Sequence, residues 1–137
     1  MAKIDVLTHP FEALFDAVPD TVFFMKDAEG RYTSVNQTLV QRLGRRSKAE
    51  LIGCTARDVF PAPLGARILA QDRQSAAGGR PLHSALELHL YPGGAEGWCL
   101  SWKEPVRDAA GRIVGLAGLS RDLQTRAAEP SAFAGIS

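Results

Sequence analysis

Hydrophobic residues along the chain change their spacing in a way that predicts both helices and strands. A short amphipathic helix comes first, ended by Pro19, with apolar residues at helical spacing: Phe11, Leu14, Phe15 and Val18. Residues 22–25 are apolar on both faces, which predicts a central strand covered on both sides, and residues 31–35 return as its neighbour. A sheet of this kind needs helices to cover it.

The middle of the chain supplies such helices. Asn36 can cap a helix that ends at Gly44. Two short helices are predicted by sequences with capping-box spacing, Ser47-Lys48-Ala49-Glu50 and Thr55-Ala56-Arg57-Asp58. A longer helix is predicted from Pro63 to about Ala77, with Gly78-Gly79 as its break. Its inward residues are expected to be Leu64, Ile68 and Leu69.

In the last third of the chain the period falls to two. Leu82, Leu86, Leu88 and Leu90 alternate with His83, Ala85, Glu87 and His89, which predicts a strand with one apolar side. After a reversal at residues 92–97, Trp98, Leu100 and Trp102 alternate with Cys99, Ser101 and Lys103. Residues 113–119 are apolar on both faces, like residues 22–25. We expect these two apolar strands to be neighbours at the centre of the sheet.

Two turns nearly repeat each other. Asp27-Ala28-Glu29-Gly30-Arg31 and Asp108-Ala109-Ala110-Gly111-Arg112 each lie between strand-like runs. Asp can bond the backbone two residues on, and Gly accepts a positive φ, so Asp-x-x-Gly suits a hairpin. The chain therefore reads as a hairpin, then helices, then three strands, an α+β class of fold.

The amino-acid composition narrows the range of possible functions. The 137 residues are 45% hydrophobic and suit one domain, while the formal charge of +1 gives no reason to expect direct binding of nucleic acid or an acidic membrane. Cys54 and Cys99 have no paired spacing, which favours a reduced chain over a disulfide or zinc site. No run approaches the ~20 apolar residues of a membrane helix. We expect a cytoplasmic domain.

Four motifs in this order resemble the PAS domain, a small sensory module of signalling proteins. They are Phe24-Met25-Lys26-Asp27-Ala28-Glu29-Gly30-Arg31-Tyr32 with Val35-Asn36, then Leu51-Ile52-Gly53 leading to Asp58-Val59-Phe60-Pro61, then Gly111-Arg112-Ile113-Val114-Gly115, and finally Ser120-Arg121-Asp122-Leu123. The ending Ser120-Arg121-Asp122-Leu123-Gln124 also resembles PAS segments that precede AraC-type helix-turn-helix transcription regulators. The resemblance covers residues 11–123.

The resemblance implies a five-stranded antiparallel sheet with helices on one face and a flanking N-terminal helix. We expect a flanking helix in residues 1–19, a PAS core in 20–123, and a linker in 124–137 toward an effector outside this chain. Haem-binding relatives use an axial His on the long helix, which lacks one here, and flavin photoreceptors carry Cys in a Gly-x-x-Cys-Arg motif that Cys54 does not match. We expect neither haem nor flavin, and either a small organic ligand or none.

Candidate residues follow from this expectation. A ligand pocket would be lined by inward residues: Phe24, Phe60, Ile68, Leu88 and Trp102. Trp98 and Trp102 share a strand face, and they either fill the core, pack against the first helix, or form an aromatic wall of the pocket. His83 and His89 are expected on the solvated side of their strand. The resemblance makes Asp122, just after the last strand, the residue that transmits the signal, and Asp122 is expected at the surface beside Arg121.

No catalytic triad or metal cluster is evident, so we expect a non-catalytic sensor. In this interpretation the domain forms a homodimer through the Phe11, Leu14, Phe15 and Val18 stripe, and it passes a ligand- or partner-dependent change to an effector, which the resemblance suggests is DNA-binding. Three alternatives stay open: a pure dimerisation module with a side-chain-filled pocket, the input domain of a histidine kinase, or that of a cyclic-dinucleotide enzyme.

Overall fold

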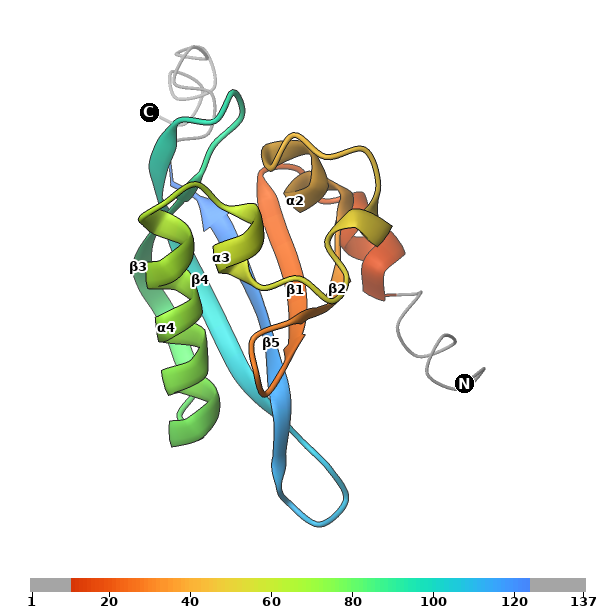
Figure 1. Ribbon diagram of the computed structural model, residues 1–137, viewed down its shortest axis with the longest axis vertical. Helices are drawn as coiled ribbons and strands as arrows, with labels where there is room; N and C mark the ends of the chain where they lie inside the picture. Colours follow the sequence, from red (N-terminus) through yellow and green to blue (C-terminus); the bar gives the residue numbers. More distant parts are fainter. Residues whose placement is uncertain (1–10, 124–137) are drawn as a thin grey trace, which may run out of the picture.

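The computed structural model describes residues 11–123 and contains one five-stranded antiparallel sheet (Figure 1). The strands are β1 (Thr21–Asp27), β2 (Tyr32–Val35), β3 (Leu82–Leu90), β4 (Glu96–Arg107) and β5 (Ile113–Asp122). Their order across the sheet is β2-β1-β5-β4-β3. The two strands predicted to be apolar on both faces, β1 and β5, are paired at the centre over the full length of β1, as expected.

The inner face of the sheet is covered by the helical segment between β2 and β3 (Figure 1). It consists of α2 (Gln37–Arg42), a short 3-10 helix η1 (Lys48–Glu50), α3 (Ala56–Val59) and α4 (Leu64–Gly78), which ends at a left-handed Gly79. The predicted breaks at Gly44 and Gly79 are confirmed, since both adopt positive φ. Leu64, Ile68 and Leu69 of α4 are buried, also as predicted.

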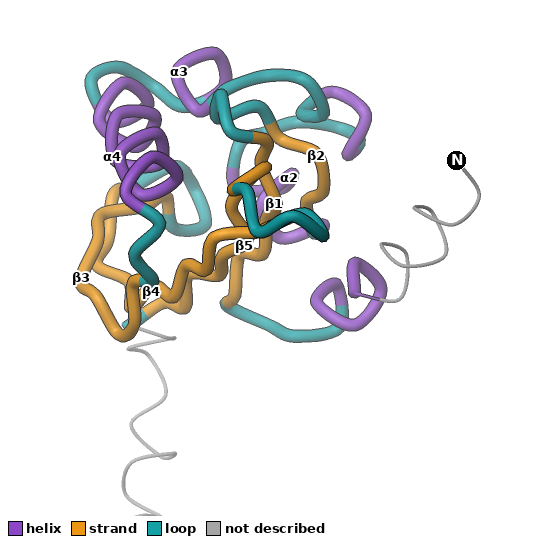
Figure 2. The backbone as a smooth tube through the Cα atoms, turned by 90° about the horizontal axis from the view of Figure 1, so that it is seen from below, coloured by secondary structure: helices purple, strands orange, loops and turns teal. Residues whose placement is uncertain are grey.

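A helix at residues 11–16 lies on the opposite side of the sheet from α3 and α4 (Figure 2). Its Phe15 ring stacks on Phe23 of β1 with centroids 4.4 Å apart. Lys48 fastens the helix further, because its ammonium pairs with Glu12 at 3.0 Å and Asp16 at 2.9 Å. The predicted flanking helix is therefore present over residues 11–16, docked on the outer face near β2.

The two repeated turns close in the same way. In each turn the first Asp side chain accepts hydrogen bonds from the backbone N–H groups two and four residues later, at 2.9–3.0 Å. Gly30 and Gly111 both take positive φ, and each donates its N–H to the carbonyl of the Asp. One joins β1 to β2 and the other joins β4 to β5, as the repeat predicted.

Asn36 connects α2 to β1. Its Oδ1 accepts the N–H groups of Leu39, which caps the helix, and of Phe23 in the neighbouring strand. Its Nδ2 donates to the carbonyls of Thr21 and Phe15. The side chain is fully buried, and its four hydrogen bonds satisfy it completely. Both predicted capping boxes, at Ser47 with Glu50 and at Thr55 with Asp58, are also present.

The predicted apolar faces of β3 and β4 are wrong. Among the four leucines expected to point inward from β3, only Leu90 is buried, and Leu86 is 62% exposed. On β4 the buried residues are Cys99, Ser101 and Lys103, while Trp98 is 54% exposed. The inward polar groups of β4 find partners: Lys103 contacts Asp72 of α4 and Glu87 of β3, and Ser101 bonds Ser120 of β5.

Candidate functional site

Four charged side chains meet between the sheet and α4. Asp72 of α4 pairs with both Lys26 of β1 and Lys103 of β4, the latter at 3.1 Å, and Lys103 also reaches Glu87 of β3 at 3.1 Å. The four side chains are between 1% and 14% exposed. We call these four residues the inner charge cluster. Two cations and two anions make it electrically balanced.

Aromatic rings border this cluster. The Lys26 ammonium lies 4.9 Å from the ring centroid of Phe24 and 4.5 Å from that of Tyr32, within range of a cation–π attraction. Burial nevertheless dominates and lowers the pKa of Lys26, while Asp72 opposes the shift. Burial likewise raises the pKa of Tyr32 well above its ordinary value, so the phenol stays protonated.

The predicted pocket residues are only partly brought together. Phe24, Phe60 and Ile68 belong to the core beneath the helices, and the half-buried Leu88 packs against it. Ile68 and Leu88 also line a cleft of about 170 Å³ between α4 and the β3–β4 edge, with Glu87 and Trp98. Trp102 lies elsewhere.

Trp102 faces the outer side of the sheet, because its neighbours Ser101 and Lys103 face inward. It lines a largely apolar hollow of about 560 Å³. The other lining residues come from the first helix and the outer sheet face: Phe15, Val18, Thr21, His83, Glu104, Leu119 and Arg121. The two tryptophans therefore border different hollows, and neither is a fully buried core residue.

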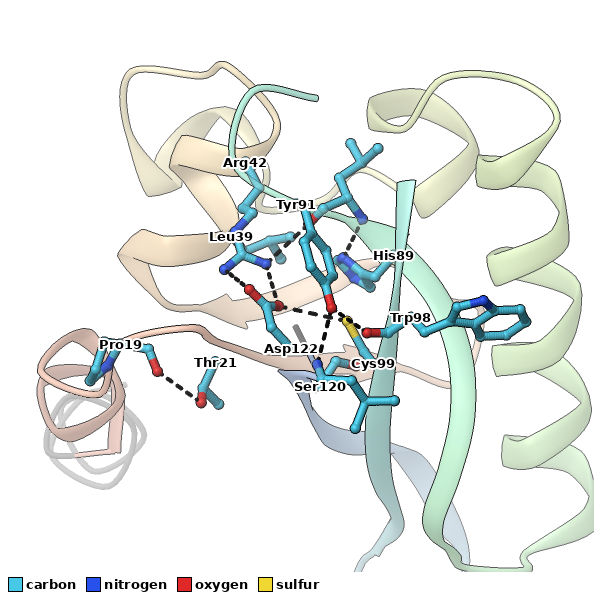
Figure 3. A network of polar contacts seen from close by, with 12 residues as sticks. Pro19, Thr21, Leu39, Arg42, His89, Tyr91, Trp98, Cys99, Ser120 and Asp122 are labelled. Carbon is cyan, nitrogen blue, oxygen red and sulfur yellow. Dashed lines mark hydrogen bonds and ion pairs between the residues drawn. The ribbon is translucent and has the colours of Figure 1, made fainter. Parts of the chain in front are cut away.

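A second ionic contact lies at the end of β5 (Figure 3). Arg42 of α2 donates two parallel hydrogen bonds to the Asp122 carboxylate, at 2.8 and 2.9 Å, and also donates to the carbonyl of Leu90 at 3.0 Å. Both side chains are less than 5% exposed. The expectation of a surface Asp122 beside Arg121 is therefore wrong: Asp122 is buried, and its partner is Arg42 from the helical segment.

Backbone hydrogen bonds also fix the position of Asp122 and of the residue that follows it. Its N–H donates to the carbonyl of Asp20, which precedes β1, at 3.0 Å. The next N–H, that of Leu123, donates to the Trp98 carbonyl at 3.1 Å and to the Tyr91 hydroxyl at 3.0 Å. We call Arg42, Asp122 and these contacts the exit clamp. It ties the end of the sheet to α2 and to the β3–β4 connection (Figure 3).

Cys99 joins the exit clamp from β4. Its Sγ lies 3.7 Å from Asp122 Oδ1, and burial followed by the nearby carboxylate raises the pKa of this thiol to about 12. A thiol in this state is a weak nucleophile. Cys99 therefore packs as a small hydrophobic residue with a weak donor.

His89 corrects another expectation, since it is buried rather than solvated. Its ring lies edge-on to Phe60, with centroids 5.0 Å apart, and its Nδ1 accepts the Leu90 N–H at 3.0 Å. Burial lowers the pKa of His89 to about 3, helped by the positive charges of Lys26 and Arg42. The imidazole is neutral at physiological pH. His83 remains exposed, beside Glu104.

Within residues 11–123 no helix is long and apolar enough to cross a membrane. Among the same residues no group of three or more His, Cys, Asp or Glu side chains is arranged to hold a metal ion. The functional residues missed from the sequence are the paired ones, Lys26, Asp72, Lys103 and Arg42. For Lys26 and Lys103 the available signal was a charged residue within a strand that carries large apolar residues, whereas Asp72 and Arg42 lie on helices α4 and α2 and had no such signal.

The strand order and helical cover match a known family. The family model described as PAS fold matches residues 15–128. The chain belongs to the PAS-fold family. The PAS domain of Bordetella pertussis BvgS has the same fold, with a TM-score of 0.69, 21% identity and 96% of each chain covered. The resemblance inferred from the sequence motifs is confirmed, and the domain is a PAS sensory module.

Two relatives of this PAS domain carry further information. A structure of the Vibrio cholerae VqmA dimer in the absence of target DNA, described in connection with the DNA-binding mechanisms of LuxR-type receptors, is 28% identical with a TM-score of 0.69, over 85% of this chain and 52% of that one. The methanogenesis regulatory histidine kinase FilI of Methanothrix harundinacea is 27% identical over 88% of this chain and 13% of its own length. The chain thus spans about half of VqmA and a small part of FilI.

Proposed function

We propose that this PAS domain is the non-catalytic input domain of a dimeric, DNA-binding transcription regulator, and that it responds to a small organic ligand without haem or flavin. The likeness to VqmA supports the class of effector, since that dimer is described in connection with the DNA-binding mechanisms of LuxR-type receptors, and a further VqmA structure, 28% identical, is described as bound to DPO. In this proposal the ligand binds between α4 and the sheet, beside Phe24, Phe60, Ile68 and Leu88.

The exit clamp is the observation that carries the proposal. Asp122 is the last residue of β5, so any segment that follows the sheet leaves from it. Through Arg42 this residue is attached to α2 and to the end of β3, two elements that belong to opposite edges of the fold. A change in the helical layer would therefore alter the anchoring of the exit.

A buried row on β4 joins the inner charge cluster to the exit clamp. Lys103 contacts Asp72, Ser101 shares a 2.7 Å hydrogen bond with Ser120 of β5, and Cys99 contacts Asp122. The three β4 residues are successive inward positions of one strand. In the proposed mechanism, ligand binding at α4 shifts the population between two arrangements of this row and of the exit.

The test uses the full-length protein with its effector. Asp122→Asn should change reporter output, because it removes the charge that holds Arg42 while keeping the shape of the side chain. Leu69→Ala, a core substitution on α4, serves as the control for lost stability, with both melting temperatures measured. If reporter output falls in proportion to the loss of melting temperature in both variants, Asp122 has a purely structural role.

Two other functions remain as alternatives, each with its own support. A histidine kinase input domain is favoured by the likeness to FilI. A pure dimerisation module is favoured by the filled interior, in which Phe24, Phe60 and Leu64 are buried. Native mass spectrometry of freshly purified protein separates a ligand-bound domain from an empty one, since only the former carries additional mass.

A further inference from the structure

Asp72 has an unusual position in the inner charge cluster. It extends from the middle of α4 toward the sheet, and its two carboxylate oxygens contact two different ammonium groups, those of Lys26 and Lys103. All three side chains are at most 4% exposed. Asp72 is thus the only part of α4 within this cluster, and it holds the helix to two strands at once.

The charge balance of the cluster depends on Asp72. Lys26 and Lys103 contribute two positive charges, while Asp72 and Glu87 contribute two negative charges. Without the Asp72 carboxylate, one positive charge would remain unpaired in a site shielded from water, which is strongly unfavourable. The position between the two ammonium groups therefore requires an anion, whether it belongs to the protein or to a ligand.

The surroundings favour a flat anion. The Phe24 ring lies 4.9 Å from the Lys26 ammonium and 6.0 Å from that of Lys103, and the Tyr32 ring lies 4.5 Å from Lys26. Phe24 and Tyr32 are themselves edge-to-face, with centroids 6.3 Å apart. Two cations thus stand beside aromatic surfaces. A ring bearing one carboxylate or comparable anionic group matches both features.

A cleft opens next to the cluster. The cleft has a volume of about 170 Å³ and lies between α4 and the β3–β4 edge, where Ile68, Leu86, Leu88 and Trp98 form apolar walls. Glu87 also lines the cleft, and its carboxylate is 3.1 Å from the Lys103 ammonium. The space corresponds to roughly six water molecules at about 30 Å³ each, enough for one small ring. Glu87 is thus the cluster residue that lines the cleft, and its contact with Lys103 connects the cleft to the anion position.

We propose that Asp72 is a built-in competitor for a small flat monoanion, which enters through this cleft and replaces the Asp72 carboxylate between Lys26 and Lys103. This inference rests on the proposed ligand-sensing function and names the class of ligand. The exchange keeps the cluster neutral, because one negative charge replaces another. Since Asp72 is part of α4, ligand binding releases the contact that holds α4 to β1 and β4.

Benzoate is the probe for this proposal, and benzamide is its uncharged control. In the purified domain, Asp72→Asn removes the competitor and should lower the Kd for benzoate by about tenfold or more, or ~1.4 kcal/mol. Benzamide affinity should stay unchanged. Lys103→Met in the Asp72→Asn background should abolish the gain. Glu96→Gln, which removes an exposed carboxylate at the start of β4, should bind benzoate like the wild type.

Equal benzoate affinity in the wild type and Asp72→Asn would overturn the proposal. Because Asp72→Asn could unfold the domain, the wild type provides a second measurement: benzoate should shift the carboxyl ¹³C NMR resonance of Asp72, and an unmoved resonance at saturation would contradict displacement. The failure of this inference and the failure of the proposed function give different results. If native mass spectrometry finds a natural ligand but the Asp72 resonance does not move, the proposed function stands and only the displacement of Asp72 by an anion is rejected.

Discussion

Arg42 and Asp122 form a buried bidentate pair, and breaking it should be costly. Removing one partner leaves the other charge buried and uncompensated, which typically destabilises a protein by ~3–5 kcal/mol. We expect Asp122→Ala and Arg42→Met each to lower the free energy of unfolding by about this amount. Urea unfolding followed by circular dichroism measures it. This is far more than the effect of a surface pair.

The double variant Arg42→Met with Asp122→Ala is the control. It removes both charges together, so it should be markedly more stable than the sum of the two single changes. Additive losses would mean that the two residues act independently. That result would reject the exit clamp as a coupled pair.

His89 should make stability depend on pH. In the unfolded chain its pKa is near 6.5, whereas the folded state lowers it to about 3. Between these values the unfolded chain binds a proton that the folded protein does not, so stability falls as the pH falls from 6.5 toward 3. The loss between pH 7 and pH 5 should reach about 2 kcal/mol.

Matched histidine variants test this dependence. His89→Gln should flatten the decline in unfolding free energy between pH 7 and pH 5. His83→Gln, at an exposed ring, should leave the decline in place. If the slopes of the wild type and His89→Gln coincide, His89 is not the titrating group.

Local contacts of single residues could be predicted from the sequence, and distant ones could not. The Asn36 cap and the Glu50 capping box join residues three apart, so their spacing is sufficient. Arg42 and Asp122 are 80 residues apart, and only the folded sheet brings them together. A charged residue near a strand end is typically solvated, which explains why Asp122 was expected at the surface.

At the scale of elements, the faces of β3 and β4 were predicted with the wrong orientation for a physical reason. Alternation predicts two faces but not which one is buried, and apolar residues are normally assigned inward. Here Lys103 and Glu87 neutralise each other with Asp72, while Ser101 bonds Ser120. These partners come from α4 and β5, so the pattern within β3 and β4 does not contain them.

The first helix is expected to provide a dimer contact. Phe11 and Leu14 are 55% and 60% exposed, whereas Phe15 of the same helix packs on the sheet. Burying the exposed pair against a second subunit would remove apolar surface from water. Phe11→Glu with Leu14→Glu should therefore shift a dimer toward monomer without unfolding the core, as measured by analytical ultracentrifugation.

A different exposed apolar residue provides the control for that change. Leu86→Glu alters β3, which lies at the opposite edge of the sheet from β2. It should leave the dimer intact. If the wild-type protein sediments only as a monomer, the proposed dimer is wrong. If Leu86→Glu weakens the dimer as much as the first-helix change does, the interface is not specific to the first helix.

For the whole molecule, we expect a colourless protein. The long helix contains no histidine to ligate haem iron, and Cys54 lacks the sequence context of a flavin photoreceptor. The absorption spectrum of the purified domain should therefore end with the aromatic band near 280 nm, about the usual position for Trp and Tyr. A Soret band or flavin bands that persist through gel filtration would contradict this expectation.

The fold as a whole was more predictable than its site. Two repeated Asp-x-x-Gly turns and two strands apolar on both faces determined the hairpins and the central pair, β1 and β5. The five-stranded antiparallel sheet with helices on one face was what the family resemblance implied. The sites could not be read in this way, because the inner charge cluster combines side chains from four separate elements.

The hydrogen bond between the Asp122 N–H and the Asp20 carbonyl places the beginning and the end of the sheet side by side. A domain whose two ends meet can be inserted into a surface loop of another protein with little cost in loop-closure entropy. Residues 20–123 should therefore function as a cassette: spliced into a host enzyme, they would bring the two host segments within one hydrogen bond of each other when folded and release them when unfolded.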